Sequence, residues 1–583
     1  MVCYRNRIHW ISAGSFLLLQ IVGILIGPLL QEVAAQTGKA GAREFVLRGQ
    51  KAVTQGDWTT AEKAFHQALR VEPRSAALHA SLGAAQLRLG KLREAERSYS
   101  EAVRLQPREP SFQMGLAEVY LRQSRLDAAA SEYAALVKLD PESFDAHYNL
   151  GLVFLRQKQC HRAAVQLERA DKLTPGLPET AVNLVEAYFC AGDIAKATEK
   201  AEQVQAKWKD APKVLYSLGL VLYSSSAYKT ADEAFAKAWE LLPNETEIGL
   251  KMVHCRLAMS SYREALTGLL EIRKKIPPTE ETELLLGHTY AGLNEGAHAV
   301  QAFREAVRLN PRSAPAHLAL GRQLLQEADL EGSISHLREA HRLAPNDVAA
   351  VISLAQALIK GVKFKEAIEL LENRATDPTT SSERLSLLAV AYASQGRFSQ
   401  AAPLLEMIAR REPDNDRAYF LLGYVRAELG QGDAALRAYQ AAIRLNPKSA
   451  AYFSHYASLL ERQGKLSQAA QNLQSALALE PDSPIAHYGL GRVLTQMGEY
   501  QQAAAHLQKS IAAGQPPARA YYLLATCHGR LGNTALAEEY RAKFAEMATR
   551  SQQEEYINLS GDVEPRSFGR SQFALPPAAE TSP

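Results

Sequence analysis

Residues 302–321 read AFREAVRLNPRSAPAHLALG, and residues 438–457 read AYQAAIRLNPKSAAYFSHYA. The two segments begin 136 residues apart, which is four times 34. Prolines keep the same period, at positions 73, 107, 141, 175, 243, 277, 311, 345, 413, 447 and 481. If each of these prolines is the thirty-second residue of a repeat, fifteen repeats of 34 residues fit from Ala42 to Ser551 without insertion or deletion. A period of this length predicts an array of small stacked units, not a set of globular domains.

Three further columns keep the same frame. Position 20 of the repeat is alanine in fourteen of the fifteen copies, and Ser333 is the exception. Position 8 is glycine in eight copies and mostly alanine elsewhere. Position 24 is usually large and apolar, as in Phe65, Tyr99, Tyr133, Phe235, Phe303 and Tyr439. The columns therefore alternate small and large residues, which favours close packing of neighbouring elements.

Each repeat predicts two helices. Apolar residues follow helical spacing in two runs, for example Leu320, Leu324 and Leu325, then Ile334, Leu337 and Ala340. A short polar break separates the runs and contains Gly56, Gly90, Gly192, Gly396, Gly430, Gly464, Gly498 or Gly532 in eight repeats. Glycine there can take the left-handed conformation that ends a helix. The proline at position 32 stops the second helix because it lacks the N–H that the next turn would need.

Small residues at positions 8 and 20, a large residue at 24 and proline at 32 resemble the tetratricopeptide repeat over about 510 residues. The resemblance implies an all-α, right-handed superhelical solenoid of about fifteen 34-residue helix-turn-helix repeats, with the first helices on its concave side. Position 4 departs from the family, which often has tryptophan there. This sequence has His79, His147, Leu215, His317, Tyr419, Phe453, His487 and Tyr521 instead, and we expect the histidines to be packing residues.

The N-terminus differs from the rest of the chain. Arg5 and Arg7 precede an apolar stretch from about Ile11 to Leu30, and Val33 and Ala35 suit cleavage after Ala35. Residues 1–35 are therefore predicted to be a signal peptide, or a signal anchor if they are not cleaved. Either form exports the rest of the chain to the periplasm or the extracellular space, and an uncleaved segment would anchor it to the inner membrane. Residues 36–41 are expected to be a short linker.

The C-terminus changes in character after the last repeat. Residues 552–559 are expected to complete a polar capping helix, which the end of a solenoid needs for solubility. Residues 560–583 are rich in Pro, Ser and Gly and are predicted to be disordered.

Charge and cysteine content limit the classes of partner. The chain has 66 basic and 63 acidic residues, a balance that argues against nucleic acid as the main partner. A membrane is expected to be contacted only through the N-terminal segment, if that segment stays attached. Four cysteines follow Ala35, namely Cys160, Cys190, Cys255 and Cys527. They permit disulfides in an exported protein, but their spacing favours isolated buried thiols.

Catalytic signatures are absent from the sequence. No GxSxG, HExxH, Walker or Rossmann motif occurs, and the repeats leave no stretch for a catalytic domain. We therefore predict a protein that is not an enzyme and that needs no cofactor and no metal.

By the resemblance, positions 2, 5, 9, 12 and 13 of the first helices face the groove. Arg88, Arg122 and Arg156 occupy position 13 of three consecutive repeats. They could form a cationic ladder that grips carboxylates. Alternatively, each arginine interacts favourably with the dipole at the end of its own helix.

Aromatic and further basic side chains occupy the same columns. Tyr148, Phe189, Tyr216 and Tyr223 follow the arginines, and Arg322, Tyr424, Tyr488 and Arg492 come later. Tyrosine beside arginine is typical of binding hot spots, but these rings could equally be core between hairpins. His254 and His288 share position 9 of adjacent repeats, and we expect them to contact solvent or a ligand and not to bind a metal.

The sequence thus predicts a protein-interaction scaffold outside the cytoplasm that binds an extended peptide or a helix of a protein partner in its groove. The alternative is a membrane-anchored structural component of an envelope assembly or export complex, for which the Ile11–Leu30 helix would stay uncleaved. Carbohydrate binding along the aromatic residues is a third possibility.

Overall fold

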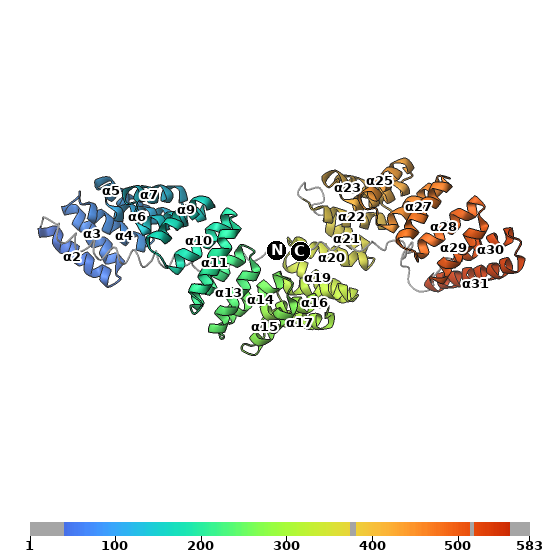
Figure 1. Ribbon diagram of the computed structural model, residues 1–583, viewed down its shortest axis with the longest axis horizontal. Coiled ribbons are helices and arrows are strands. Elements are labelled where there is room, and N and C mark those ends of the chain that lie inside the picture. Colours follow the sequence, from blue (N-terminus) through green and yellow to red (C-terminus); the bar gives the residue numbers. More distant parts are fainter. Residues whose placement is uncertain (1–39, 373–379, 514–517, 560–583) are drawn as a thin grey trace. The chain divides into compact units, whose positions relative to one another are not determined.

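The computed structural model describes residues 40–372, 380–513 and 518–559. Within these ranges the chain is all-helical, and thirty helices follow one another as consecutive packed pairs, which confirms the predicted fold class (Figure 1). The predicted signal segment 1–35 and the tail 560–583 lie outside the described residues. No helix in the described ranges combines the length and the apolar content that a bilayer crossing requires.

The chain divides between Leu309 and Asn310 into two compact parts, which we name the N-terminal body and the C-terminal body. The helices of the N-terminal body are α2 (Ala40–Thr54), α3 (Trp58–Val71), α4 (Ala76–Arg88), α5 (Leu92–Leu105), α6 (Pro110–Arg122), α7 (Leu126–Leu139), α8 (Phe144–Arg156), α9 (Cys160–Leu173), α10 (Pro178–Ala191), α11 (Ile194–Lys207), α12 (Pro212–Ser224), α13 (Tyr228–Leu241), α14 (Thr246–Ala258), α15 (Tyr262–Arg273), α16 (Glu280–Gly292) and α17 (Gly296–Leu309).

The helices of the C-terminal body are α18 (Ala314–Gln326), α19 (Leu330–Leu343), α20 (Val348–Lys360), α21 (Phe364–Glu372), α22 (Ser382–Ser394), α23 (Phe398–Arg411), α24 (Asp416–Glu428), α25 (Gly432–Leu445), α26 (Ala450–Arg462), α27 (Leu466–Leu479), α28 (Pro484–Met497), α29 (Tyr500–Ala512), α30 (Ala518–Arg530) and α31 (Thr534–Leu559). The last helix thus runs through residues 552–559.

The helix boundaries follow the repeat frame. Every even-numbered helix from α4 to α30 begins at position 1 of its repeat, and every odd-numbered helix begins at position 17. The first helix is an exception, because α2 begins at Ala40, inside the segment 36–41 that was expected to be a linker. Most second helices end at position 30, as α5 does at Leu105, because the residue before a proline disfavours helical backbone.

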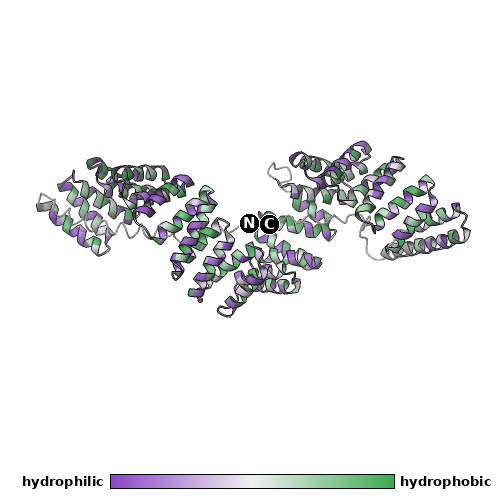
Figure 2. Ribbon diagram, in the orientation of Figure 1, coloured by the Kyte–Doolittle hydropathy of each residue, from purple (hydrophilic) through white to green (hydrophobic). Residues whose placement is uncertain are grey.

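The small and large columns pack against each other as expected. A Cβ atom at Gly219 (position 8) would lie 2.6 Å from the ring of Phe235 (position 24), so only a hydrogen leaves room for that ring. Position 20 is fully buried, and at its one non-alanine the Ser333 hydroxyl donates a 2.8 Å hydrogen bond to the Gly321 carbonyl. Hydrophobic and hydrophilic residues are interspersed along the helices of both bodies (Figure 2).

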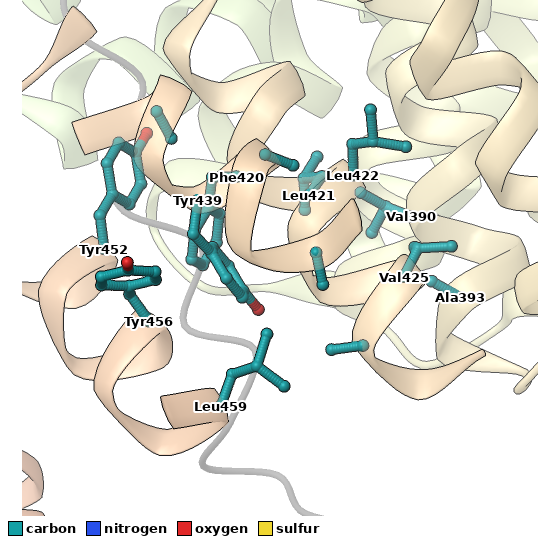
Figure 3. Packing of buried hydrophobic residues seen from close by; sticks show 14 of the residues in the cluster. Val390, Ala393, Phe420, Leu421, Leu422, Val425, Tyr439, Tyr452, Tyr456 and Leu459 are labelled. Atoms are coloured by element: carbon teal, nitrogen blue, oxygen red, sulfur yellow. The ribbon is translucent and has the colours of Figure 1, made fainter. Parts of the chain in front are cut away.

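Buried apolar side chains form one cluster in the C-terminal body that extends from Ile334 to Cys527. Figure 3 shows part of this cluster, where the rings of Phe420, Tyr439 and Tyr452 lie together. The centroids of the Phe420 and Tyr452 rings are 4.7 Å apart. In the N-terminal body the buried residues form five smaller clusters.

Candidate binding surface

All thirteen residues predicted to bind a partner lie on first helices. We name the surface made by positions 2, 5, 9, 12 and 13 of these helices the first-helix face. Nine of the predicted residues belong to the N-terminal body, on α4, α6, α8, α10, α12, α14 and α16, and four belong to the C-terminal body, on α18, α24 and α28. Within each body they lie on neighbouring repeats.

The three arginines at position 13 have different surroundings. The guanidinium of Arg88 lies 5.6 Å from the Trp58 ring centroid, and burial together with the nearby Arg122 lowers the pKa of Arg88. Arg122 forms an ion pair with Glu118, with 2.9 Å between Nε and Oε1. Arg156 is exposed and makes no hydrogen bond or ion pair within the described ranges. Because Glu118 offsets the charge of Arg122, the three arginines do not form a ladder of three unpaired cations.

The aromatic residues of the N-terminal body range from core to half-exposed. Tyr148 is 2% exposed, stacks on Phe144 and accepts a hydrogen bond of 2.9 Å from Asn183, so the core alternative describes its position. Phe189, Tyr216 and Tyr223 are half-buried and pack against the core from the surface. These three rings keep exposed area on the first-helix face.

The two histidines at position 9 have different neighbours, Glu281 for His254 and Phe303 for His288. His254 lies 3.6 Å from Glu281, measured from Nε2 to Oε1, and this contact lowers the pKa of the Glu281 carboxyl. His288 is exposed and its ring meets Phe303 edge-on, with centroids 5.1 Å apart. Among the described residues, no group of three or more His, Cys, Asp and Glu side chains could hold a metal ion.

The four residues of the C-terminal body contact the neighbouring repeat or their own helix. Arg322 donates from Nε to the Ser353 hydroxyl at 2.7 Å. Tyr424 lies beside Phe398 and His455. Arg492 lies 5.5 Å from the ring centroid of Tyr488 and pairs with Glu461 at 2.5 Å.

A regular contact between repeats underlies several of these pairs. The side chain at position 9 reaches position 2 of the next repeat in His254–Glu281 and in Gln356–Glu383. It reaches position 6 of the next repeat in Arg322–Ser353 and Tyr424–His455. These partners are 27 or 31 residues apart, a spacing that could have been read from the columns and that the sequence prediction missed.

The sequence prediction also missed three side chains on α8 and α10 that can accept hydrogen bonds. Asn149 is 1% exposed, and its Oδ1 atom has no hydrogen-bond partner although its amide donates to the Asp145 carbonyl. The carboxylates of Asp145 and Glu186 make no hydrogen bond within the described residues, and burial raises the pKa of both. Asp145 and Glu186 occupy positions 2 and 9, so the same columns predict their place on the first-helix face.

The cysteine prediction was wrong for two of the four residues. Cys160, at the start of α9, and Cys190, near the end of α10, form a disulfide with Cα atoms 5.4 Å apart. Cys160 is at position 17 of one repeat and Cys190 is at position 13 of the next, and the packing of the two repeats brings these positions together. The separation of the two cysteines in the sequence does not reveal this contact. Cys255 and Cys527 are buried free thiols, and burial raises the pKa of Cys255 to about 12.

Comparison with known protein families agrees with the repeat frame. Two family models, each described as tetratricopeptide repeat, match residues 46–110, 82–142, 114–178, 284–348, 386–450 and 460–539, more than half of the chain. A search of the curated proteins finds no match.

Solved structures with similarity to the chain include the Cut9–Hcn1 hetero-tetramer of the APC/C, with 15% identity, a TM-score of 0.36 and coverage of 81% of this chain and 99% of that one. A tetratricopeptide repeat protein from Parabacteroides merdae has 18% identity, a TM-score of 0.30 and coverage of 49% and 100%. YrrB, a TPR protein with an unusual peptide-binding site, has 20% identity, a TM-score of 0.28 and coverage of 32% and 97%.

Proposed function

Because the chain belongs to the tetratricopeptide repeat family, we propose that it is a non-enzymatic scaffold that binds a protein partner on the first-helix face. The partner contributes an extended segment or a helix, and binding takes place outside the cytoplasm. The family supports the scaffold class, and the place of binding and the location rest on the features below.

The observation that carries the place of binding is the set of unpaired acceptors on α8 and α10. A carboxylate without a protein partner is available to a donor on a ligand, and the charge-assisted hydrogen bond that forms is roughly twice as strong as one between neutral groups. Asp145, which is half-buried, and Glu186, which is exposed, offer carboxylates at positions 2 and 9 of the first-helix face. The Asn149 carbonyl oxygen is buried at position 6 of α8, behind this face. A peptide supplies the matching donors, through its backbone N–H groups and through Lys or Arg side chains.

Exposed rings flank these acceptors. Phe189, Tyr216 and Tyr223 lie on α10 and α12 and keep part of their area exposed. The hydroxyl of Tyr216 donates to Glu247 at 2.9 Å, which holds the ring in place. Fixed aromatic side chains beside polar groups are favourable anchors for a partner because little side-chain freedom is lost on binding.

Two features support a location outside the cytoplasm. The Cys160–Cys190 disulfide would form and persist in an oxidising compartment. The basic start and apolar stretch of residues 1–35 have the layout of an export signal.

The place of binding is tested by affinity capture from envelope extracts on residues 36–583, followed by a binding assay with the purified partner. We expect Glu186→Arg to weaken binding at least about tenfold, because it removes an acceptor and places a cation on the first-helix face. Glu202→Arg is the matched control: it makes the same charge change at an exposed position of α11, in the same repeat, and should bind as the wild type does. Equal binding by both variants would contradict the proposed surface.

The location is tested by fractionating the producing cells and sequencing the N-terminus of the mature chain. A mature protein outside the cytoplasm that begins at Gln36 is the expected result. An intact N-terminus in the membrane fraction would favour the anchored structural component instead. A chain found in the cytosol, with reduced Cys160 and Cys190 in a non-reduced digest, would contradict export.

A further inference from the structure

Two pairs of histidines occupy the same columns in different repeats of the C-terminal body. His317 on α18 faces His336 on α19, and His487 on α28 faces His506 on α29. The Nδ1 atoms are 3.0 Å apart in the first pair and 2.9 Å apart in the second. In both pairs the residues stand at positions 4 and 23, and the ring centroids are 5.2 Å apart.

A backbone contact fixes which ring nitrogen of the position 4 histidines carries the proton. Nε2 of His317 lies 3.3 Å from the Pro311 carbonyl oxygen, and Nε2 of His487 lies 2.9 Å from that of Pro481. A carbonyl oxygen only accepts, so Nε2 must donate, and in the neutral ring Nδ1 keeps its lone pair. An imidazole that binds a metal usually donates its other N–H to a carbonyl or carboxylate in this way.

The spacing of the rings is close to that of two ligands of one ion. Two imidazoles bound to a tetrahedral ion through bonds of about 2.0–2.1 Å have nitrogens about 3.3 Å apart and ring centroids about 5.2 Å apart. The centroids already have that separation, so to bind the ion the nitrogens must part by a few tenths of an ångström and both rings must tilt until their lone pairs converge on it. Without a metal, a single proton between the two Nδ1 atoms forms the hydrogen bond.

We propose that each histidine pair binds a divalent transition-metal ion of the zinc type through its two Nδ1 atoms, in place of the proton that they share. No third His, Cys, Asp or Glu side chain of the described residues joins either pair, so water completes the coordination and the sites are open. Imidazole nitrogen is a preferred ligand of such ions.

Nearby charges rank the two sites. Glu339 is close enough to His317 to interact electrostatically, and Arg342 offsets its charge through an ion pair, so the first pair has no net cation beside it among these groups. His487 interacts electrostatically with Asp482 but also with Lys509, whose positive charge disfavours a metal cation nearby. We therefore expect the His317–His336 site to bind the ion more tightly than the His487–His506 site.

Repeat 4 supplies the variant that tests the proposal. There His147 has the same contact with its proline, from Nε2 to the Pro141 carbonyl at 3.1 Å, but faces Gln166, with 2.7 Å between Nδ1 and Oε1. His336→Gln and His506→Gln copy this native pair, so they remove one metal ligand while keeping a hydrogen bond that the fold already uses. His79→Gln is the control, because His79 also contacts its proline carbonyl, at 3.0 Å, but its repeat has Ser98, not histidine, at position 23.

The experiment is a calorimetric titration of the full chain with Zn²⁺ at pH 7.5. The expected result is two ions bound by the wild type and by His79→Gln, one by each single variant and none by the double variant H336Q/H506Q. Binding should weaken as the pH falls below about 6.5, since protons compete for Nδ1. No binding by the wild type, or a stoichiometry that the double variant does not change, would overturn the proposal.

A second measurement uses the wild type alone and does not depend on the folding of a variant. Zn²⁺ should protect His336 and His506 from diethyl pyrocarbonate, with the modified residues located by mass spectrometry. His298, an exposed histidine outside the pairs, should react equally with and without Zn²⁺. If Zn²⁺ left the modification of His336 and His506 unchanged, as it should for His298, the proposal would also be overturned.

Discussion

One residue at the turn within each repeat takes the left-handed conformation, and in seven repeats it is a residue type that does not favour it. Position 15 is left-handed in all fifteen repeats, in eight as glycine and in seven as Ser124, Lys158, Ser226, Ser260, Asn294, Ala328 and Val362. Val362 has φ 61°, although the preceding residue, Gly361, would take this conformation without strain. The packing of the two helices, not the local preference, therefore decides which residue turns.

We predict that Val362→Gly stabilises the chain by about 1 kcal/mol. The left-handed conformation costs a β-branched residue about 1–2 kcal/mol, and the greater conformational entropy that glycine loses on folding offsets part of the gain. Urea unfolding followed by circular dichroism measures the change. Gly430→Val is the matched reverse: its φ is 76° and an added Cβ meets nothing within 4 Å, so only backbone strain enters. Destabilisation by Val362→Gly would show that the valine side chain, half-exposed here, contributes more than the strain.

The His487–His506 pair makes the stability of repeat 14 depend on pH. Burial lowers the pKa of both imidazoles below its ordinary value near 6.5, and Lys509 lowers both further. The unfolded chain then binds more protons than the folded one between the lowered pKa values and 6.5, so stability is full above that window and falls as the pH drops through it. Without metal, hydrogen exchange of α28 and α29 should therefore speed up, relative to intrinsic rates, between pH 7.5 and 5.5.

His506→Gln should reduce this pH dependence, since the repeat then has the uncharged partner seen in repeat 4. An identical pH dependence in the variant would mean that other groups are responsible.

At the scale of helices, one ring can hold two neighbouring first helices at a fixed distance. Tyr99 on α5 lies between Gly83 on α4 and Gly115 on α6, where added Cβ atoms would approach the ring to 2.7 Å and 2.2 Å. The ring is 5% exposed and so cannot swing away. Glycine at these positions is therefore required by packing and not by backbone conformation.

Gly115→Ala should destabilise the chain by about 1–3 kcal/mol, the usual range for overpacking a rigid site. Gly529→Ala is the control within a first helix: the nearest atoms to its added Cβ lie 3.9 Å away, and alanine there should stabilise by about 0.5–1 kcal/mol through helix propensity. Midpoints of urea unfolding compare the two. A neutral Gly115→Ala would show that α4 and α6 can move apart at little cost.

At the scale of the whole molecule, the two bodies bury their apolar side chains differently. The C-terminal body has one cluster from Ile334 to Cys527, whereas the buried residues of the N-terminal body fall into five clusters. In a repeat array, cooperativity depends on the interfaces between neighbouring repeats. A continuous cluster couples those repeats more strongly than separate clusters do.

We therefore predict that a fragment of residues 310–583 unfolds in urea in one sharp transition, and that residues 36–309, of similar length, unfold over a broader range. The slope m of the free energy of unfolding against urea concentration measures this, because m scales with the surface exposed in one cooperative step. A larger m for residues 36–309 would contradict the prediction.

The sequence by itself determined the repeat frame and with it the order and the boundaries of the helices. Steric requirements recur every 34 residues, so they appear as columns: alanine at position 20, a small residue at position 8 and proline at position 32. It also determined that the thirteen proposed residues lie on first helices, because column number alone specifies the helix.

Only the tertiary structure decided which of those residues already have partners. Arg122 with Glu118, His254 with Glu281 and the Cys160–Cys190 disulfide depend on how one helix lies against the next, and that arrangement follows from packing along the whole array. The same packing imposes the left-handed turn on Val362 and leaves the Asn149 carbonyl oxygen without a donor. Column patterns record what every repeat needs, whereas these contacts arise from the particular pair of residues that the fold places side by side.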